Sequence, residues 1–208
     1  MLSNPQKPYK MFHSRADSSL EYIKRATKED YDIIELDVRK SKDDVLFCYH
    51  DSLFATLLRF LDFKNVKKII SVNKLEDILK VIDVDKIVFL DIKDKDISTN
   101  DLDNVCCKFN KEFWLAGYSL KQLAKFRQEF GDKYKYIYNF AFLFFKIGLK
   151  KVVKAKIDAI KIFPWHYNKK NMDKLKNNNI AYALQEYIVS QKKLKQIAKK
   201  YGSLWLIR

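Results

Sequence analysis

Two carboxylates interrupt an apolar segment near the start of the chain, in the sequence IIELDV. Glu35 and Asp37 are two residues apart, so on a β-strand their side chains project from one face while Leu36 projects from the other. A buried strand seldom carries charge, because desolvating a carboxylate is costly unless a cation compensates it. The pair therefore indicates either a cation-binding site or a salt-bridged rim of a sheet.

Four further residues that could do chemistry stand at the ends of predicted strands. His13 ends the segment YKMFH, His50 ends VLFCYH, and Asp91 and Lys93 share one face of IVFLDIK. In barrels of parallel strands and helices, catalytic residues gather at the carboxyl ends of the strands. A lone histidine is more often a hydrogen-bonded structural residue, and His50-Asp51 is compatible with a simple turn. Their joint occurrence at strand ends favours a catalytic site.

These residue types fit the chemistry of a phosphodiester. Glu35, Asp37 and Asp91 cannot all ionise at close range without a compensating charge, and oxygen ligands favour Mg²⁺ or Ca²⁺ over zinc. A divalent cation together with Lys93 would neutralise the oxygens of a phosphodiester in the transition state. Two histidines on opposite sides of the phosphorus can divide the work of base or nucleophile and of acid.

Short β-branched or aromatic segments alternate with amphipathic helices along most of the sequence. The predicted strands are 9–13, 33–38, 45–50, 87–93, 113–118, 134–140, 159–163, 180–184 and 203–208. Helical spacing of apolar residues is found in 19–30, 73–82, 119–130, 168–178 and 190–201. The alternation predicts a parallel sheet, and KSKDD (40–44) predicts a hairpin because it is too short for a crossover helix.

The strand count fits a compact (β/α)₈ barrel with one extra strand in the hairpin. Such barrels usually have about 250 residues, and this chain has 208, so its loops must be short. A doubly wound open sheet is the alternative, but the chain has only 4 glycines and no glycine-rich loop after its first strand. No Pro/Gly/Ser-rich linker divides the sequence, so we expect a single domain over residues 1–208.

The composition favours acidic partners. Lys and Arg number 41 against 26 Asp and Glu, a formal net charge of +15, which attracts nucleic acid, anionic membranes or phosphate-bearing substrates. No nucleic-acid-binding motif accompanies the charge, so we do not expect a nucleic-acid partner. The odd cysteine count argues against a disulfide framework, and neither a signal core nor a membrane-spanning apolar run is present. We expect a cytoplasmic protein.

The segment Asn139–Lys156 combines an aromatic block with an amphipathic basic stretch. The simpler interpretation is a barrel strand that leads into an outer helix with a lysine-rich solvent face. The alternative is an element that lies on anionic lipid and gives the protein a peripheral membrane contact.

The candidate catalytic and metal-binding residues, in this order along the chain, resemble those of the glycerophosphodiester phosphodiesterase family. The segments FHSR, IIELDVRKSKDDVLFCYHD and VFLDIKD are similar to its His-Arg, Glu-x-Asp, His-Asp and acid-x-Lys elements, and the similarity extends along the chain. The resemblance implies a (β/α)₈ barrel, a divalent cation and a small glycerol- or polyol-phosphodiester substrate. It implies that the acid-base pair is His13 and His50, that the metal ligands are Glu35, Asp37 and Asp91, and that Lys93 contacts phosphate.

Three positions depart from the family pattern. Ser14 stands where the family has a phosphate-binding arginine, which makes Arg15 the candidate replacement. Asp91 stands where glutamate is common, and Leu184-Gln185 stands where the family has Trp-Thr. The related sphingomyelinase D and phospholipase D toxins have an Asp-Leu-Lys element that is similar to Asp91-Ile92-Lys93, but their disulfide-bearing loop has no counterpart here.

Two other functions remain open from the sequence. The first is a lysophospholipase D-like enzyme at a membrane surface, with Asn139–Lys156 as the docking element. The second is a catalytically decayed barrel that only binds a phosphate-bearing ligand. Ser14 keeps the second alternative open, whereas the persistence of the other six catalytic-type residues argues against it.

Overall fold

The structure is a computed structural model that describes residues 8–14, 19–50, 55–140, 149–164, 167–184, 191–201, 203 and 205–207. The chain divides into two compact units. The N-terminal unit is Phe12–Phe113, and the C-terminal unit comprises the described parts of Met1–Met11 and Trp114–Arg208.

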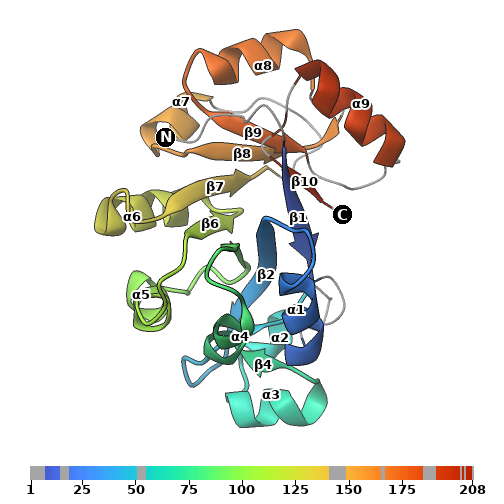
Figure 1. Cartoon of the computed structure of the whole chain (residues 1–208). Coiled ribbons are helices and arrows are strands. Elements are labelled where there is room, and N and C mark those ends of the chain that lie inside the picture. Colours follow the sequence, from blue (N-terminus) through green and yellow to red (C-terminus); the bar gives the residue numbers. More distant parts are fainter. Residues whose placement is uncertain are drawn as a thin grey trace. The chain divides into compact units, whose positions relative to one another are not determined.

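The N-terminal unit is built on two neighbouring strands, Ile33–Lys40 and Ile87–Ile92, that pair in parallel, with the short strand Leu46–Cys48 antiparallel to the first. Its elements, shown in Figure 1 from blue to green, follow the end of β1 (Tyr9–His13). They are α1 (Leu20–Thr27), β2 (Ile33–Lys40), β3 (Leu46–Cys48), α2 (Ala55–Leu58), α3 (Phe63–Ile69), β4 (Asn73–Lys74), α4 (Leu75–Val81), β5 (Ile87–Ile92) and α5 (Thr99–Cys106).

The C-terminal unit alternates strands and helices regularly. Its elements are β6 (Phe113–Gly117), α6 (Leu120–Phe130), β7 (Lys135–Asn139), α7 (Leu149–Lys154), β8 (Ala159–Ile162), α8 (Lys169–Lys176), β9 (Ala181–Leu184), α9 (Gln191–Tyr201) and β10 (Trp205–Ile207). Strands β6 to β9 pair in parallel in chain order, and β10 pairs in parallel with the start of β1. Within the described ranges, each helix is too short or too polar to cross a bilayer.

All nine predicted strands are confirmed, with ends that differ by a few residues. The predicted hairpin over residues 40–44 is also confirmed, since Val38 and Cys48 are antiparallel partners. Asp44 adopts a left-handed conformation in this turn, with φ 59°, which Asp tolerates better than bulkier residues. The structure adds β4, α2, α3 and α5, elements of two to eight residues that were not among the predicted segments.

Strand β2 is buried along almost its whole length, from Ile33 to Arg39. Parallel strands that are covered on both faces are normally apolar throughout. The charged residues Glu35, Asp37 and Arg39 are therefore exceptions that cost free energy unless each is paired. The fold consequently requires compensating groups around the carboxyl half of β2.

Side-chain caps fix the start of several helices. The hydroxyl of Ser98 accepts a hydrogen bond from the Asp101 N–H while the Asp101 carboxylate accepts one from the Ser98 N–H, which forms a reciprocal capping box at α5. The same Asp101 lies 3.2 Å from the Lys40 ammonium at the end of β2. The first turn of α5 is thereby tied to the carboxyl end of β2.

An apolar cluster packs α2 and α3 against β3. Its buried members are Phe47, Leu58, Phe63, Val66 and Val72, and Figure 1 shows α2, α3 and β4 gathered near α4. The rings of Phe47 and Phe63 are 6.0 Å apart. Because β3 leads directly to His50, this cluster supports the position of that histidine.

We expect Phe47→Ala to lower the free energy of unfolding by about 3–5 kcal/mol, because it leaves a cavity in this cluster. Phe60→Ala is the matched control: Phe60 is 65% exposed, and its loss should change the free energy by less than about 0.5 kcal/mol. Urea unfolding followed by circular dichroism measures both variants. Equal losses would contradict the cluster's role.

Candidate active site

The three predicted acids meet at neighbouring strands. Asp37 on β2 and Asp91 on β5 are direct partners in the parallel register, and Glu35 precedes Asp37 by two residues on the same strand. All three are at most 2% exposed, and each offers a carboxylate oxygen within 4.8 Å of those of the other two. The three acids therefore lie together, as the two-residue spacing along each strand predicted.

Lys93 lies directly beside two of these acids. Its backbone N–H donates to the carbonyl of Val38 across the strands, at 3.0 Å. Its ammonium is 2.9 Å from Oδ1 of Asp37 and 2.7 Å from Oδ2 of Asp91. Lys93 was expected to contact phosphate; in the structure it bridges two of the expected metal ligands.

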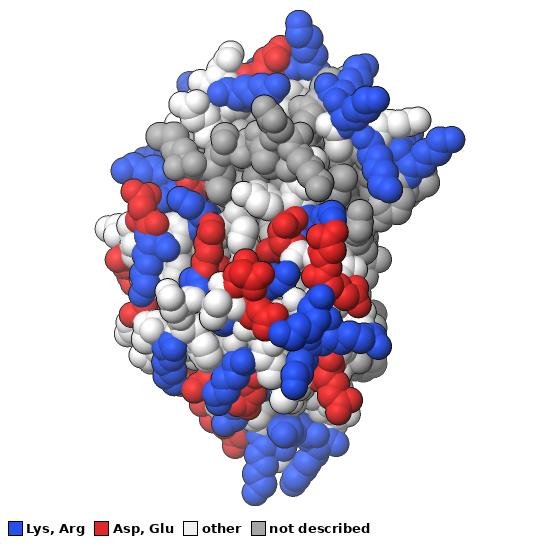
Figure 2. Space-filling model, viewed as in Figure 1, with Lys and Arg blue, Asp and Glu red and all other residues white. Residues whose placement is uncertain are grey.

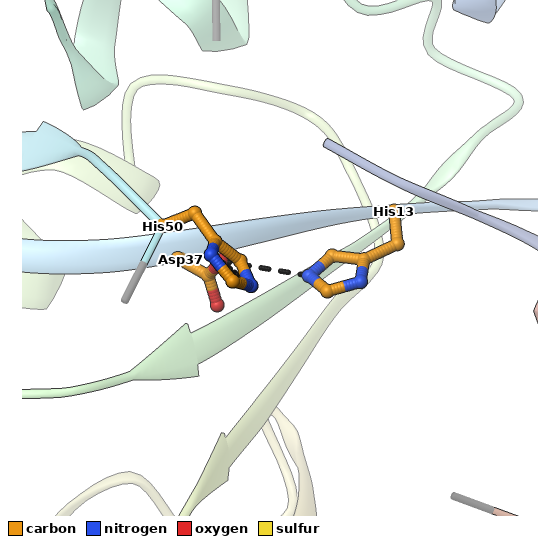
Figure 3. Close-up of side chains that lie close together, drawn as sticks. All are labelled: His13, Asp37 and His50. Atoms are coloured by element: carbon orange, nitrogen blue, oxygen red, sulfur yellow. Dashed lines mark ion pairs between the residues drawn. The ribbon is translucent and has the colours of Figure 1, made fainter. Parts of the chain in front are cut away.

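Both predicted histidines converge on Asp37 from separate strands. His13 ends β1 and His50 follows β3, and their Nε2 atoms lie 3.5 Å and 4.0 Å from Oδ2 of Asp37. The imidazole centroids are 5.4 Å apart, and Figure 3 shows both rings beside the carboxylate. The N–H of Tyr49 donates to the Asp37 carbonyl at 3.0 Å, which fixes the backbone immediately before His50.

Asp37 lies between Lys93 on one side and the two histidines on the other. Its Oδ1 faces Lys93 and its Oδ2 faces the imidazoles. Burial alone would raise the pKa of Asp37, but the adjacent His13 imidazole and the nearby Lys93 ammonium outweigh burial and hold that pKa well below its usual range. Asp37 is therefore an anion in the folded protein at neutral pH.

The three acids fit a hard divalent cation. When ionised, they carry three negative charges, and Lys93 contributes one positive charge to Asp37 and Asp91. The difference is two negative charges, which equals the charge of Mg²⁺ or Ca²⁺, and carboxylate oxygens are the ligands that both ions prefer. The residues that would hold such an ion are Glu35, Asp37 and Asp91.

The position after His13 differs chemically from the family pattern. Ser14 is buried, and its hydroxyl donates to the backbone carbonyl of Glu35 at 3.2 Å. A neutral hydroxyl held in this way supplies no positive charge for a phosphate. Arg15 and Gln185 lie outside the described residues, and Leu184 is buried at the end of β9.

A buried ion pair beside the site was not predicted from the sequence. The Arg39 guanidinium is 3.2 Å from Oδ1 of Asp94, and Oδ2 of Asp94 accepts a hydrogen bond from the Lys40 N–H at 3.0 Å. Burial raises the pKa of Asp94, although both of these contacts oppose the rise. Arg39 continues the two-residue period of Glu35 and Asp37, a signal that could have identified it.

The comparison with protein families identifies one family. A model described as the glycerophosphoryl diester phosphodiesterase family matches residues 11–203, a span that includes every residue of the candidate site. Among curated proteins, none matches the chain in sequence.

Solved structures share the fold at low sequence identity. A phosphodiesterase from Oleispira antarctica in complex with the product sn-glycerol-3-phosphate is 12% identical, with a TM-score of 0.77 over 95% of this chain and 92% of that one. A glycerophosphodiester phosphodiesterase from Thermotoga maritima is 16% identical, with a TM-score of 0.73 over 98% and 94%. A glycerophosphodiester phosphodiesterase from Parabacteroides distasonis is 15% identical, with a TM-score of 0.74 over 96% of this chain and 91% of that one. The predicted fold, an α/β barrel of the phosphodiesterase type, is confirmed.

We expect excess Mg²⁺ or Ca²⁺ to raise the melting temperature of the chain, because a ligand that binds only the native state stabilises it by about 2.7 kcal/mol at one hundred times its Kd. Asp91→Asn removes one charged ligand and should remove most of this shift. Asp96→Asn is the matched control in the segment that follows β5, where the side chain of Asp96 is 46% exposed and pairs with Arg59. Differential scanning calorimetry tests this, and an undiminished shift in Asp91→Asn would exclude Asp91 as a ligand.

Proposed function

This chain belongs to the glycerophosphoryl diester phosphodiesterase family and is a phosphodiesterase, and from that premise we propose that it hydrolyses a small glycerol- or polyol-phosphodiester by two-histidine acid-base catalysis with a divalent cation. The observation that carries the proposal is the convergence of His13 and His50 on one oxygen of Asp37, beside the acids Glu35 and Asp91.

The proposed substrate contains glycerol phosphate. The Oleispira antarctica phosphodiesterase, which shares the fold of this chain, holds sn-glycerol-3-phosphate as its product. A product of that kind leaves when a phosphodiester between glycerol phosphate and a second alcohol is cleaved. The family to which this chain belongs supports the same substrate class here.

The two imidazoles carry the proton transfers in this mechanism. In a direct hydrolysis one Nε2 accepts a proton from the attacking water as the new oxygen–phosphorus bond forms, and the other donates a proton to the ester oxygen as its bond to phosphorus breaks and the alcohol leaves. Asp37 holds both rings toward the same point. When bound, a Mg²⁺ or Ca²⁺ ion would supply positive charge for the non-bridging phosphate oxygens.

The phosphate requires further positive charge from the protein. Lys93 is the closest described candidate, because its ammonium already lies among the acids at 2.7–2.9 Å. Arg15 follows the buried Ser14, and we assign it the second phosphate contact in place of the family's arginine. We propose that residues 1–208 act as one catalytic domain.

We place the enzyme in the cytoplasm. Its cysteines, Cys48, Cys106 and Cys107, form no disulfide in the structure, and Cys48 and Cys106 are buried. Cysteines that stay reduced are typical of a reducing compartment. Burial also raises the pKa of the Cys48 thiol, with a smaller contribution from Asp37, so Cys48 is a packing residue rather than a nucleophile.

His13→Ala and His50→Ala should each reduce turnover by about 10²–10⁴-fold while leaving the circular dichroism spectrum intact, because each removes a proton-transfer group. The assay is a panel of glycerophosphocholine, glycerophosphoethanolamine and glycerol-phosphate polymers with Mg²⁺ or Ca²⁺. Chelator should abolish turnover. His166→Ala, the chain's third histidine, is the matched control and should retain turnover; normal rates in either of the first two variants would overturn the acid-base assignment.

A second candidate function, a lysophospholipase D-like activity at a membrane surface, is supported by α7. This helix lies in the segment Asn139–Lys156, of which residues 141–148 are outside the described residues. Lys150, Lys151 and Lys154 are exposed around the buried Val152, and Val153 is 42% exposed. Exposed lysines beside an exposed apolar side chain suit an anionic lipid surface.

Reversing the three α7 lysines, in Lys150→Glu, Lys151→Glu and Lys154→Glu combined, should abolish co-sedimentation with vesicles that contain anionic phosphatidylserine. Each basic residue near such a surface contributes about 1 kcal/mol. The matched control reverses Lys64, Lys67 and Lys68 of α3, which are exposed; Figure 2 shows basic side chains gathered at the end of the N-terminal unit where Figure 1 places α3. Vesicle binding that survives the α7 reversal, or that needs no anionic lipid, would rule out this docking mode.

A further inference from the structure

The trio of His13, Asp37 and His50 has the composition of a transition-metal site. We propose that it binds a divalent ion of the zinc class, separately from the hard cation of the three acids, and that this ion inhibits the enzyme. The inhibition rests on the proposed function of the two histidines, whereas the metal binding does not. Figure 3 shows the three side chains, which come from β1, β2 and the residue pair after β3.

The distances are close to those of a metal site. Each residue offers one ligand atom, and these atoms all lie within 4.8 Å of one another. A tetrahedral ion with bonds of about 2.0–2.1 Å holds its ligand atoms about 3.4 Å apart. The observed separations from Oδ2 of Asp37 are 3.5 Å to His13 and 4.0 Å to His50, so a small movement of the more exposed His50 would bring its Nε2 to the required distance from Asp37.

The ligand chemistry separates this site from that of the three acids. Two imidazoles and one carboxylate suit zinc, cobalt, nickel or copper, whereas three carboxylates suit Mg²⁺ or Ca²⁺. Asp37 belongs to both sets, and its two oxygens have different neighbours: Oδ1 faces Lys93, and Oδ2 faces the imidazoles. Three protein ligands leave a fourth position of the ion for water.

Access to the trio lies on the side of His50. The His50 side chain is 32% exposed, whereas those of His13 and Asp37 are 8% and 2% exposed. An ion that enters there meets the imidazole of His50 first and the buried pair behind it. The partly open arrangement therefore permits loading of the folded protein.

An ion bound at the trio would stop the proposed catalysis. Metal coordination uses the Nε2 lone pair of each imidazole, the same pair that must accept or release a proton. Neither imidazole could then transfer a proton to or from the substrate. Micromolar zinc should consequently inhibit turnover even when Mg²⁺ or Ca²⁺ is in excess, and chelation of the zinc should restore it.

Binding is tested with Co²⁺, whose four-coordinate complexes absorb strongly in the visible range. Titration of the full chain with Co²⁺ should produce this absorption, and Zn²⁺ should remove it by competition. His50→Ala and His50→Gln should each weaken Co²⁺ binding by at least about tenfold, the loss expected when even an outer partner of a metal site is removed. Circular dichroism verifies that each variant is folded.

The Glu35→Gln variant separates the two metal sites. It should keep the Co²⁺ absorption and lose the stabilisation by Mg²⁺, because Glu35 belongs only to the three-acid set. An absence of Co²⁺ absorption, or its loss in Glu35→Gln rather than in the His50 variants, would overturn the second site. A chain that binds Co²⁺ through His50 but cleaves no phosphodiester would refute the proposed function and leave the metal site standing.

Discussion

Asp37 and Asp91 lie opposite each other on β2 and β5, both nearly fully buried, with the Lys93 ammonium 2.9 Å and 2.7 Å from their oxygens. Isolated buried charges cost several kcal/mol each even after the protein relaxes, so this arrangement persists only because the cation is held beside the acids. The register of β2 against β5 sets that geometry, since it aligns the two carboxylates and brings the Lys93 backbone to Val38. A shift of either strand by one residue would turn that strand's side chains to the other face and separate the two carboxylates.

The rest of the N-terminal unit holds the histidines against this charged centre. Asp43 in the hairpin turn accepts hydrogen bonds from the Ser41 hydroxyl at 2.6 Å and from the Phe63 N–H at 2.8 Å. The start of α3 is thereby tied to the turn between β2 and β3, and the buried Phe47 packs on the same helix. His50 follows β3 in this supported hairpin, so the packing of β3 against α3 helps to set the distance between His50 and Asp37. Catalytic groups gain most when their supporting contacts are rigid in this way.

Period-two spacing was sufficient to place Glu35, Asp37 and Asp91 together, because strands have a fixed alternation and parallel strands end at a common edge. It could not give the partners of Lys93, since the two-residue period sets the face of a side chain but not which of several acids its flexible stem reaches. Arg39 follows the same period, but its partner Asp94 is 55 residues away, and only the three-dimensional register joins them. The short helices α2 and α3, of four and seven residues, contain too few turns for apolar periodicity to reveal them.

For Lys93 to contact phosphate, the negative charge of Asp37 and Asp91 beside its ammonium must be balanced by another cation. In the structure its ammonium is committed to Asp37 and Asp91, and a cation held by two buried acids has little attraction left for a phosphate. A divalent ion bound by the three acids would balance the two negative charges that remain after Lys93 is counted, so that acids, ion and ammonium would together be neutral. Without the ion, the excess negative charge would repel an incoming phosphodiester. Under the proposed mechanism the affinity for phosphate therefore depends on the cation, and a chain without Lys93 would keep one excess negative charge after the ion binds.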